Sequence, residues 1–387
     1  MPDLLQQRQQ RLDLISRISE FSGAQVLVYF TADSPVMGAQ ISEDALRPMF
    51  DHLRSMGAQK PLALYLYSRG GAMEAPWKMV TMLREFSENL HVIVPYKAHS
   101  AATMIAIGAD KIHMTRKGEL GPIDPAFPAI PSQEGPAPKL PELGVEDVAA
   151  YLTFIRDRAK LTDQSALVRA VETLANSLTP ALLGRLERVY SHIRLVARNL
   201  LSLHKPPLED RQISAVTEAL TEKLYVHGHG IGRREAKNIG LDVEFLDGEE
   251  ENAVWSLYEL YEEVFRLRES MDPEGYFPQD SDSFEWPDTP FACVESVNHL
   301  HAFVGKVRAQ RIRRVPPNPT INVNLGLNLP ANIQPQQIPA AVQQVIQQLL
   351  QQAVQQINLL VAQELQKQSP VQGIIASVVG GVWKKLA

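Results

Sequence analysis

Three short runs of mostly apolar residues, each followed by a helical pattern, constrain the fold of this chain more than any other feature. They are VLVYFTA (26–32), PLALYLYS (61–68) and HVIVPYKA (91–98). Strands buried on both faces of a parallel sheet read as continuous apolar runs, and each parallel pair needs a crossover, usually a helix. The alternation therefore predicts α/β architecture with a largely parallel sheet.

The segments that follow these runs fit such crossovers. Helices are expected over 43–56, where Ser42 has the residue type of an N-cap, and over 73–86, because apolar residues recur at helical spacing in both. A nearly all-apolar helix over 100–109 and a strand over 111–116 continue the pattern. The first third of the chain is thus one uninterrupted α/β unit.

The rest of the chain changes character more than once. Five prolines within 128–144 predict an extended loop, after which helical patterns resume. No Asp, Glu, Lys or Arg occurs over 315–363, where apolar residues and glutamines follow a helical period. We therefore divide the chain into a main domain with a helical appendage (1–271), an acidic linker and surface segment (272–314), and a Gln-rich, partly disordered amphipathic helical tail (315–387).

Composition argues against several classes of function. The net charge of −6 gives no basic footprint, so no nucleic-acid partner is expected. The single cysteine, Cys293, cannot form an internal disulfide and fits a reducing compartment. The first residues lack the apolar core of a signal peptide, and no apolar run is long enough for a transmembrane helix. We expect no metal or cofactor, since His227 and His229 have no third ligand at metal-binding spacing.

Ser100 lies where acyl-transfer chemistry can be built. It directly follows a predicted strand and opens a predicted helix, so its hydroxyl lies at a strand-to-helix turn with the amide of Ala101 close by. Gly70 and Gly71 end the preceding strand, where residues without Cβ let backbone amides point at a ligand. A helix N-cap is the other interpretation of this serine. Its coupling to the glycine pair favours a nucleophile with oxyanion donors.

Three segments carry a family resemblance: YSRGGAMEA (67–75), KAHSAATMIAIGADKIHM (97–114) and GELGPIDP (118–125). They resemble successive signature segments of the SDH-family Clp-fold serine proteinases, a group similar to signal peptide peptidase A and Clp protease within the ClpP/crotonase superfamily. The resemblance covers about residues 12–265. It implies a ClpP/crotonase-like spiral of ββα units, followed by a helical region and a low-charge C-terminal tail.

The resemblance also assigns roles to residues of this chain. It implies that Ser100 is the nucleophile and that Gly70, Gly71 and Ala101 form the oxyanion hole. A substrate peptide is expected to bind as an added strand beside residues 70–73. The glycine pair follows an arginine where many relatives have proline, a change that removes no reacting group.

The general base stays open at the level of sequence. Signal peptide peptidase A and its relatives use a lysine beyond the loop that follows the nucleophile helix, and a desolvated lysine can act as a neutral base. Lys139 lies at a similar offset from Ser100, and Lys160 lies deeper in the next helical region. We favour Lys139 and keep Lys160, Asp124 and a histidine at 227 or 229 as alternatives.

These observations lead to the hypothesis of an ATP-independent serine peptidase of the Ser-Lys type, which cleaves peptides or membrane-associated protein segments through an acyl-enzyme at Ser100. Two alternatives are a catalytically inactive Clp-fold scaffold that recruits partners through its tail, and a crotonase-type acyl-CoA enzyme. The resemblance implies a homo-oligomer. We expect a cytoplasmic location, and the apolar residues and Lys pair within 371–387 also fit peripheral contact with the inner face of the membrane.

Overall fold

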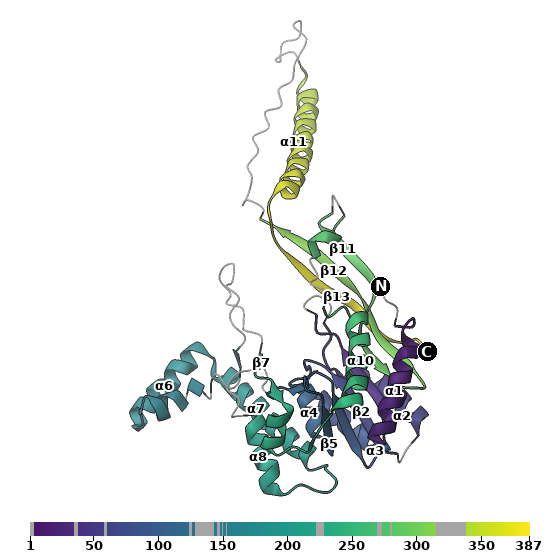
Figure 1. Cartoon of the computed structure of the whole chain (residues 1–387). Helices are drawn as coiled ribbons and strands as arrows, with labels where there is room; N and C mark the ends of the chain where they lie inside the picture. Colours follow the sequence, from purple (N-terminus) through teal and green to yellow (C-terminus); the bar gives the residue numbers. More distant parts are fainter. Residues whose placement is uncertain are drawn as a thin grey trace. The chain divides into compact units, whose positions relative to one another are not determined.

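A computed structural model gives the fold of this chain (Figure 1). It describes residues 4–34, 38–57, 60–123, 126–127, 143–144, 148, 150–151, 153–221, 228–268, 273–278, 281–314 and 338–387. The chain divides into two compact units. Unit 1 comprises residues 1–269, 288–305 and 380–387, and unit 2 comprises residues 270–287 and 306–379.

Unit 1 contains a parallel sheet in which the strands lie in the order β10, β5, β3, β2, β1. Their bounds are Gln25–Thr31 (β1), Leu62–Tyr67 (β2), Leu90–Val94 (β3), Lys111–Met114 (β5) and Val243–Phe245 (β10). The first three strands fall within the three apolar runs of the sequence, and the fourth within the strand expected over 111–116. The predicted α/β class with a parallel sheet is confirmed.

Alternate residues of each strand face two separate cores. In β1, Val26, Val28 and Phe30 pack with α1 (Arg8–Ser22) and α10 (Gly248–Val264). The intervening residues Leu27 and Tyr29 pack with helices on the opposite face of the sheet. These helices include α2 (Leu46–Met56), preceded by the 3₁₀ turn η1 (Glu43–Ala45), α3 (Ala75–Phe86), α4 (Ala101–Ile107), α7 (Pro180–Leu201) and α8 (Asp210–Thr221). Because both faces are covered, the strands are apolar throughout.

A second, small sheet follows the ends of these strands. It contains β4 (Lys97–Ala98), β6 (Glu119–Leu120) and β9 (Ile231–Gly232), in the order β4, β6, β9. Another pair is formed by β7 (Ala126–Phe127) and β8 (Leu143–Gly144). After β9, α9 (Arg233–Ile239) leads back to β10 in the main sheet. A bridge between Ser68 and Ala98 joins the end of β2 to β4, so the small sheet sets the position of the turn after β4.

The helical region that was expected after the proline-rich segment is divided by its capping residues. It contains the π-helical turn η2 (Phe154–Arg158), α6 (Gln164–Ser177) and α7. The Asp163 side chain accepts hydrogen bonds from the first amides of α6, and the Thr179 side chain accepts one from the amide of Leu182 in α7. Since Pro180 follows Thr179 as the first residue of α7, the chain begins a new helix there.

Residues 272–314 differ from the acidic linker that was expected, and this expectation was wrong. They form η3 (Pro273–Tyr276) and the long strands β11 (Ser283–Glu295) and β12 (Leu300–Arg313). The β11 segment 291–294 is buried and extends the main sheet antiparallel to β1. Acidic residues of this segment form ion pairs while remaining partly exposed. In unit 2 the ion pairs are Glu274–Arg311, Asp282–Arg313 and Glu285–Arg308.

The C-terminal region agrees with the expected tail only in part. A helix, α11 (Ala340–Gln368), occupies the Gln-rich segment as predicted (Figure 1). The last residues, however, form β13 (Val371–Lys385), which follows β12 in the order of the sheet. Its valines and isoleucines have the residue type that favours strands, a signal that the low charge of the segment obscured. Within the described ranges, no helix combines the length and the apolar character needed to cross a bilayer.

Candidate active site

Ser100 stands at a strained turn between β4 and α4. Its φ is 51° and its ψ is −115°, a region that residues with a Cβ rarely occupy. It holds the N-cap position, yet its side chain makes no capping hydrogen bond. The hydroxyl instead lies 3.7 Å from Sδ of Met73, and the residue is half-buried. The N-cap interpretation therefore does not account for this serine.

Gly70 lies directly against the candidate nucleophile. Its φ is 109°, and a Cβ built on it would lie 2.8 Å from Cβ of Ser100 and 2.9 Å from the carbonyl oxygen of His99. Neither the conformation nor the space admits another residue type. The structure therefore brings Gly70 and Ser100 together, although α3, β3 and β4 lie between them in the sequence.

Gly71 is held by an isolated parallel bridge to Ile41. The Ile41 amide donates to the Gly70 carbonyl at 2.8 Å, and the Ala72 amide donates to the Ile41 carbonyl at 2.8 Å. A Cβ on Gly71 would lie 2.4 Å from the backbone nitrogen of Ile41, so only glycine allows this approach. The bridge fixes the backbone on both sides of Gly71 and leaves the Gly71 amide itself outside the bridge.

The three predicted oxyanion residues are not equivalent in this geometry. The amide of Gly70 donates to Oγ of Ser68 at 3.1 Å, so this amide is already engaged in a hydrogen bond. Gly70 contributes the backbone conformation of the turn and not an oxyanion donor. Among the hydrogen bonds of the described residues, the amides of Gly71 and Ala101 have no acceptor. These two amides are the donors that remain for an oxyanion beside Ser100.

A buried pair of hydroxyl groups supports the glycine turn, and sequence reasoning missed it. Oγ1 of Thr31 donates to Oγ of Ser68 at 2.8 Å, and Oγ of Ser68 lies 3.3 Å from the Gly70 carbonyl oxygen. Both hydroxyl side chains are fully buried. A polar residue at the end of each of two adjacent apolar strands was the available signal, because buried hydroxyl groups require partners.

Thr103 fixes the backbone segments that flank the Ser100 turn. Its Oγ1 lies 2.7 Å from the Ala98 carbonyl oxygen and 2.8 Å from that of Gly121, and it accepts from the Gly121 amide at 3.0 Å. The His99 ring packs against Gly121 and pairs with Glu119 at 3.2 Å, while burial lowers the pKa of His99. The contacts of the His99 ring with Gly121 and Glu119 indicate a structural role for this residue.

A pocket of about 280 Å³ is linked to the Ser100 turn through Met73. Met73, which contacts the Ser100 hydroxyl, lines it together with Trp77 and with Val196 of α7. The polar residues of the lining are Glu43, Glu74, Lys78 and His192. Lys78 forms an ion pair with Glu43. This pocket is thus lined by both apolar and charged side chains, and Met73 connects it to Ser100.

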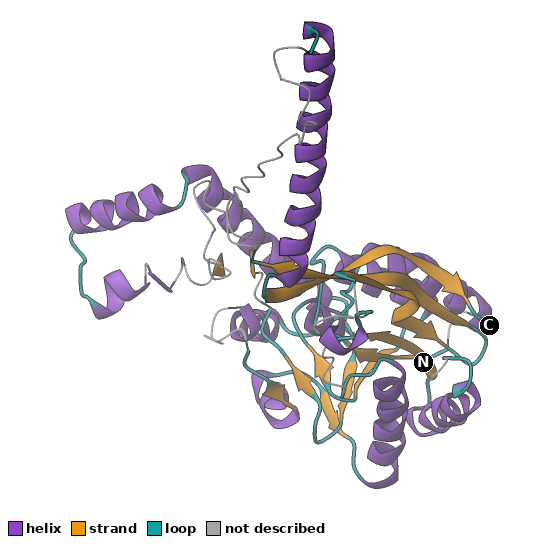
Figure 2. Ribbon diagram, turned by 90° about the horizontal axis from the view of Figure 1, so that it is seen from above, coloured by secondary structure: helices purple, strands orange, loops and turns teal. Residues whose placement is uncertain are grey.

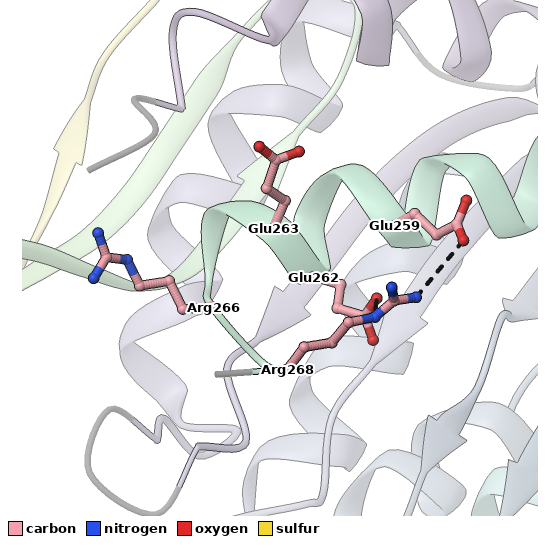
Figure 3. A pocket seen from close by; sticks show the side chains of 5 residues that line it. All are labelled: Glu259, Glu262, Glu263, Arg266 and Arg268. Carbon is pink, nitrogen blue, oxygen red and sulfur yellow. Dashed lines mark ion pairs between the residues drawn. The ribbon is translucent and has the colours of Figure 1, made fainter. Parts of the chain in front are cut away.

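Another pocket lies at the C-terminal end of α10 and carries no nucleophile (Figure 3). Five charged residues line it: Glu259, Glu262, Glu263, Arg266 and Arg268. Arg268 pairs with Glu262 at 2.6 Å and with Glu259 at 3.8 Å, so much of its charge is compensated internally. In the part of the chain that the structure describes, no group of three or more His, Cys, Asp or Glu side chains is placed to hold a metal.

The candidates for the general base are only partly described. Lys139, Asp124 and His227 lie outside the described residues. Lys160 is exposed. The ring of His229 pairs with the exposed Glu235 at 2.9 Å. Neither described candidate has the environment of an activated base.

Comparison with known proteins finds a family model that matches part of this chain. Residues 9–137 match the ClpP-like SDH-type serine proteinases. Two proteins of Methanocaldococcus jannaschii, the uncharacterized proteins MJ0137 and MJ1495, are 29% and 22% identical to this chain over 231 residues. The alignment with MJ0137 covers 60% of this chain and 68% of that protein, and the alignment with MJ1495 covers 59% and 65%.

The solved structures found by comparison include a substrate-peptide complex of a mutant 1510-N membrane-bound stomatin-specific protease. Its TM-score is 0.33 at 16% identity, covering 59% of this chain and 78% of that one. A probable enoyl-CoA hydratase/isomerase from Mycobacterium abscessus has a TM-score of 0.29 at 12% identity, covering 63% and 72%. The family match confirms the resemblance to SDH-family Clp-fold serine proteinases and the ClpP/crotonase-like fold class. At the level of the family, it supports a serine peptidase.

Proposed function

From the match to the ClpP-like SDH-type serine proteinases, we propose that this protein is an ATP-independent serine peptidase that acts through an acyl-enzyme at Ser100. One observation carries the proposal. Ser100 adopts a strained backbone conformation with a hydroxyl that caps no helix, and it lies directly against Gly70, whose neighbour Gly71 and the following residue Ala101 have amides without an acceptor among the described residues. Strain of this kind persists where surrounding structure enforces it, commonly at catalytic turns.

The proposed reaction follows the chemistry of acyl transfer. Oγ of Ser100 attacks the carbonyl carbon of the scissile peptide bond while the base takes its proton. The amides of Gly71 and Ala101 donate to the resulting oxyanion. Cleavage of the carbon–nitrogen bond releases the amine, which receives the proton, and water then hydrolyses the ester to restore the serine. Lys139 is our proposed base, ahead of the exposed Lys160 and of Asp124.

The pocket that Met73 connects to Ser100 suggests which peptides are cleaved. Met73, Trp77 and Val196 form apolar walls, so a substrate with an apolar side chain next to the scissile bond buries that side chain there. Extended substrate backbone would add beside residues 70–73, as expected from the sequence. Segments of membrane-associated proteins supply such apolar side chains. We also propose a homo-oligomer in the cytoplasm, with peripheral membrane contact.

The test is hydrolysis of internally quenched peptides that differ only in the residue before the scissile bond. Wild type should cleave Leu and Phe peptides faster than Asp peptides, and Ser100→Ala should cleave none. Ser202→Ala is the matched control, because Ser202 is an exposed serine at the end of α7. Lys139→Ala should lose activity, whereas Lys160→Ala should retain it. If wild type, like Ser100→Ala, cleaves none of the peptides, the inactive scaffold becomes the better account. Equal cleavage by the two proteins would contradict a nucleophile at Ser100.

A further inference from the structure

The strand β13 has an open edge, because it stands last in the order of the sheet, beyond β12 (Figure 1). Its residues 371–379 belong to unit 2 and expose Val371, Ile375, Val378 and Val379 by 38 to 58%. Ile375 and Val378 point to opposite faces, since side chains alternate along a strand. The edge therefore presents unpaired backbone groups flanked by apolar side chains on both faces.

Nothing in the strand protects this edge from pairing. Natural edge strands carry Lys, Pro or inward-pointing charges, or are covered by another element. From residue 371 to 383 the sequence has no Asp, Glu, Lys, Arg or Pro. An exposed, uncharged edge of this length is a template for another strand.

The pattern of the strand indicates which strand would pair with it. Val371 and Val379 lie four residues before and after Ile375, on the same face. If two copies pair antiparallel about a two-fold axis at Ile375, that residue meets its own equivalent and Val371 meets Val379. Cross-strand pairs of β-branched residues stabilise antiparallel sheets. A second copy thus matches this edge without a gap or a buried charge.

The absence of charge on the edge strand also fits a second copy. Residues 315–363 contain no ionisable side chain, and neither does the edge of β13. An uncharged surface causes no repulsion between identical copies.

We propose that the edge of β13 over residues 371–379 is a dimer interface, in which two copies of this chain join antiparallel through Ile375. The interface is isologous, so the same surface serves both copies and the assembly closes as a dimer. The proposal is independent of the catalytic one, because it rests only on residues of unit 2.

The first test measures the mass of the full-length protein by sedimentation over a range of concentrations. Wild type should be dimeric. Ile375→Lys places two like charges opposite each other at the axis and should raise the dissociation constant at least about 100-fold. Leu349→Lys, an equal change at an exposed position of α11, is the control and should leave the dimer intact.

The second test fixes the register by oxidation of single cysteine variants. Ile375→Cys should form a disulfide-linked dimer, because the two cysteines face each other across the axis. Val378→Cys should not, since its opposite residue would be Gln372 of the other copy. Cys293 is buried and cannot compete. A monomeric wild type, a dimer broken only by Leu349→Lys, or binding of monomer to anionic vesicles through this edge would each overturn the proposal.

Discussion

Replacement of Ser100 by glycine should stabilise the protein relative to replacement by alanine. Both variants lack the hydroxyl, but alanine keeps a Cβ at a φ of 51°, whereas glycine adopts this conformation freely. Relief of such strain is worth about 1 to 3 kcal/mol. Glycine also raises the entropy of the unfolded chain, which costs about 0.4 to 1 kcal/mol. The net gain in the free energy of unfolding should be about 0 to 2.6 kcal/mol, or about 1.3 kcal/mol from the midpoints of the two terms.

Equilibrium urea unfolding of the two variants measures this difference. Ser202 provides the control pair, because it follows α7 with an ordinary φ of −72°. At that position the glycine variant should be less stable than the alanine variant by about 0.5 to 1 kcal/mol. If Ser100→Gly proves no more stable than Ser100→Ala, the backbone at the turn is not strained. The structural argument for a nucleophile at Ser100 would then fail.

Three further predictions concern the supports of the site and the response to pH. Ser68→Ala removes the acceptor of the Gly70 amide and should slow fluorophosphonate labelling about 10 to 100-fold with unchanged circular dichroism, while Ser68→Thr should restore part of the rate. Gly70→Ala forces a Cβ to 2.8 Å from Ser100 and should abolish labelling, with a loss of stability of about 2 to 6 kcal/mol by urea unfolding. Burial lowers the pKa of His52 to about 3, so the unfolded chain binds its proton first. The free energy of unfolding should therefore decrease as the pH is lowered from 6.5 to 3. In His52→Gln this decrease should be smaller, and urea unfolding midpoints measured at pH 7, 5 and 4 for wild type and variant test the difference.

The parallel sheet could be predicted from sequence because burial on both faces leaves a strong local signal. Tyr29 and Phe30 are adjacent in β1 and both fully buried, so the segment reads as one apolar run. The strands β11 and β12 left a weaker signal, since acidic and basic residues are interleaved with their apolar ones. Asp282 and Arg313 are far apart in the sequence, and only the folded structure shows that they pair.

The site was predictable where a residue type and a spacing together define the geometry. Gly70, Gly71 and Ser100 form such a set, and the structure places Gly70 against Ser100. The hydroxyl pair of Thr31 and Ser68 was not predictable, because single hydroxyl residues at strand ends are common. The engagement of the Gly70 amide depends on that pair, so the division of roles between the two glycines could not be read from the sequence.

The central claim is that Ser100 is a nucleophile, and labelling with a fluorophosphonate probe tests it most directly. The probe reacts with an activated serine, and peptide mass spectrometry locates the adduct. We predict a single adduct on Ser100, no adduct on Ser100→Ala, and an unchanged adduct on Ser202→Ala. An unlabelled wild type, under conditions where a known serine hydrolase is labelled, would contradict the claim, as would an adduct on any other residue.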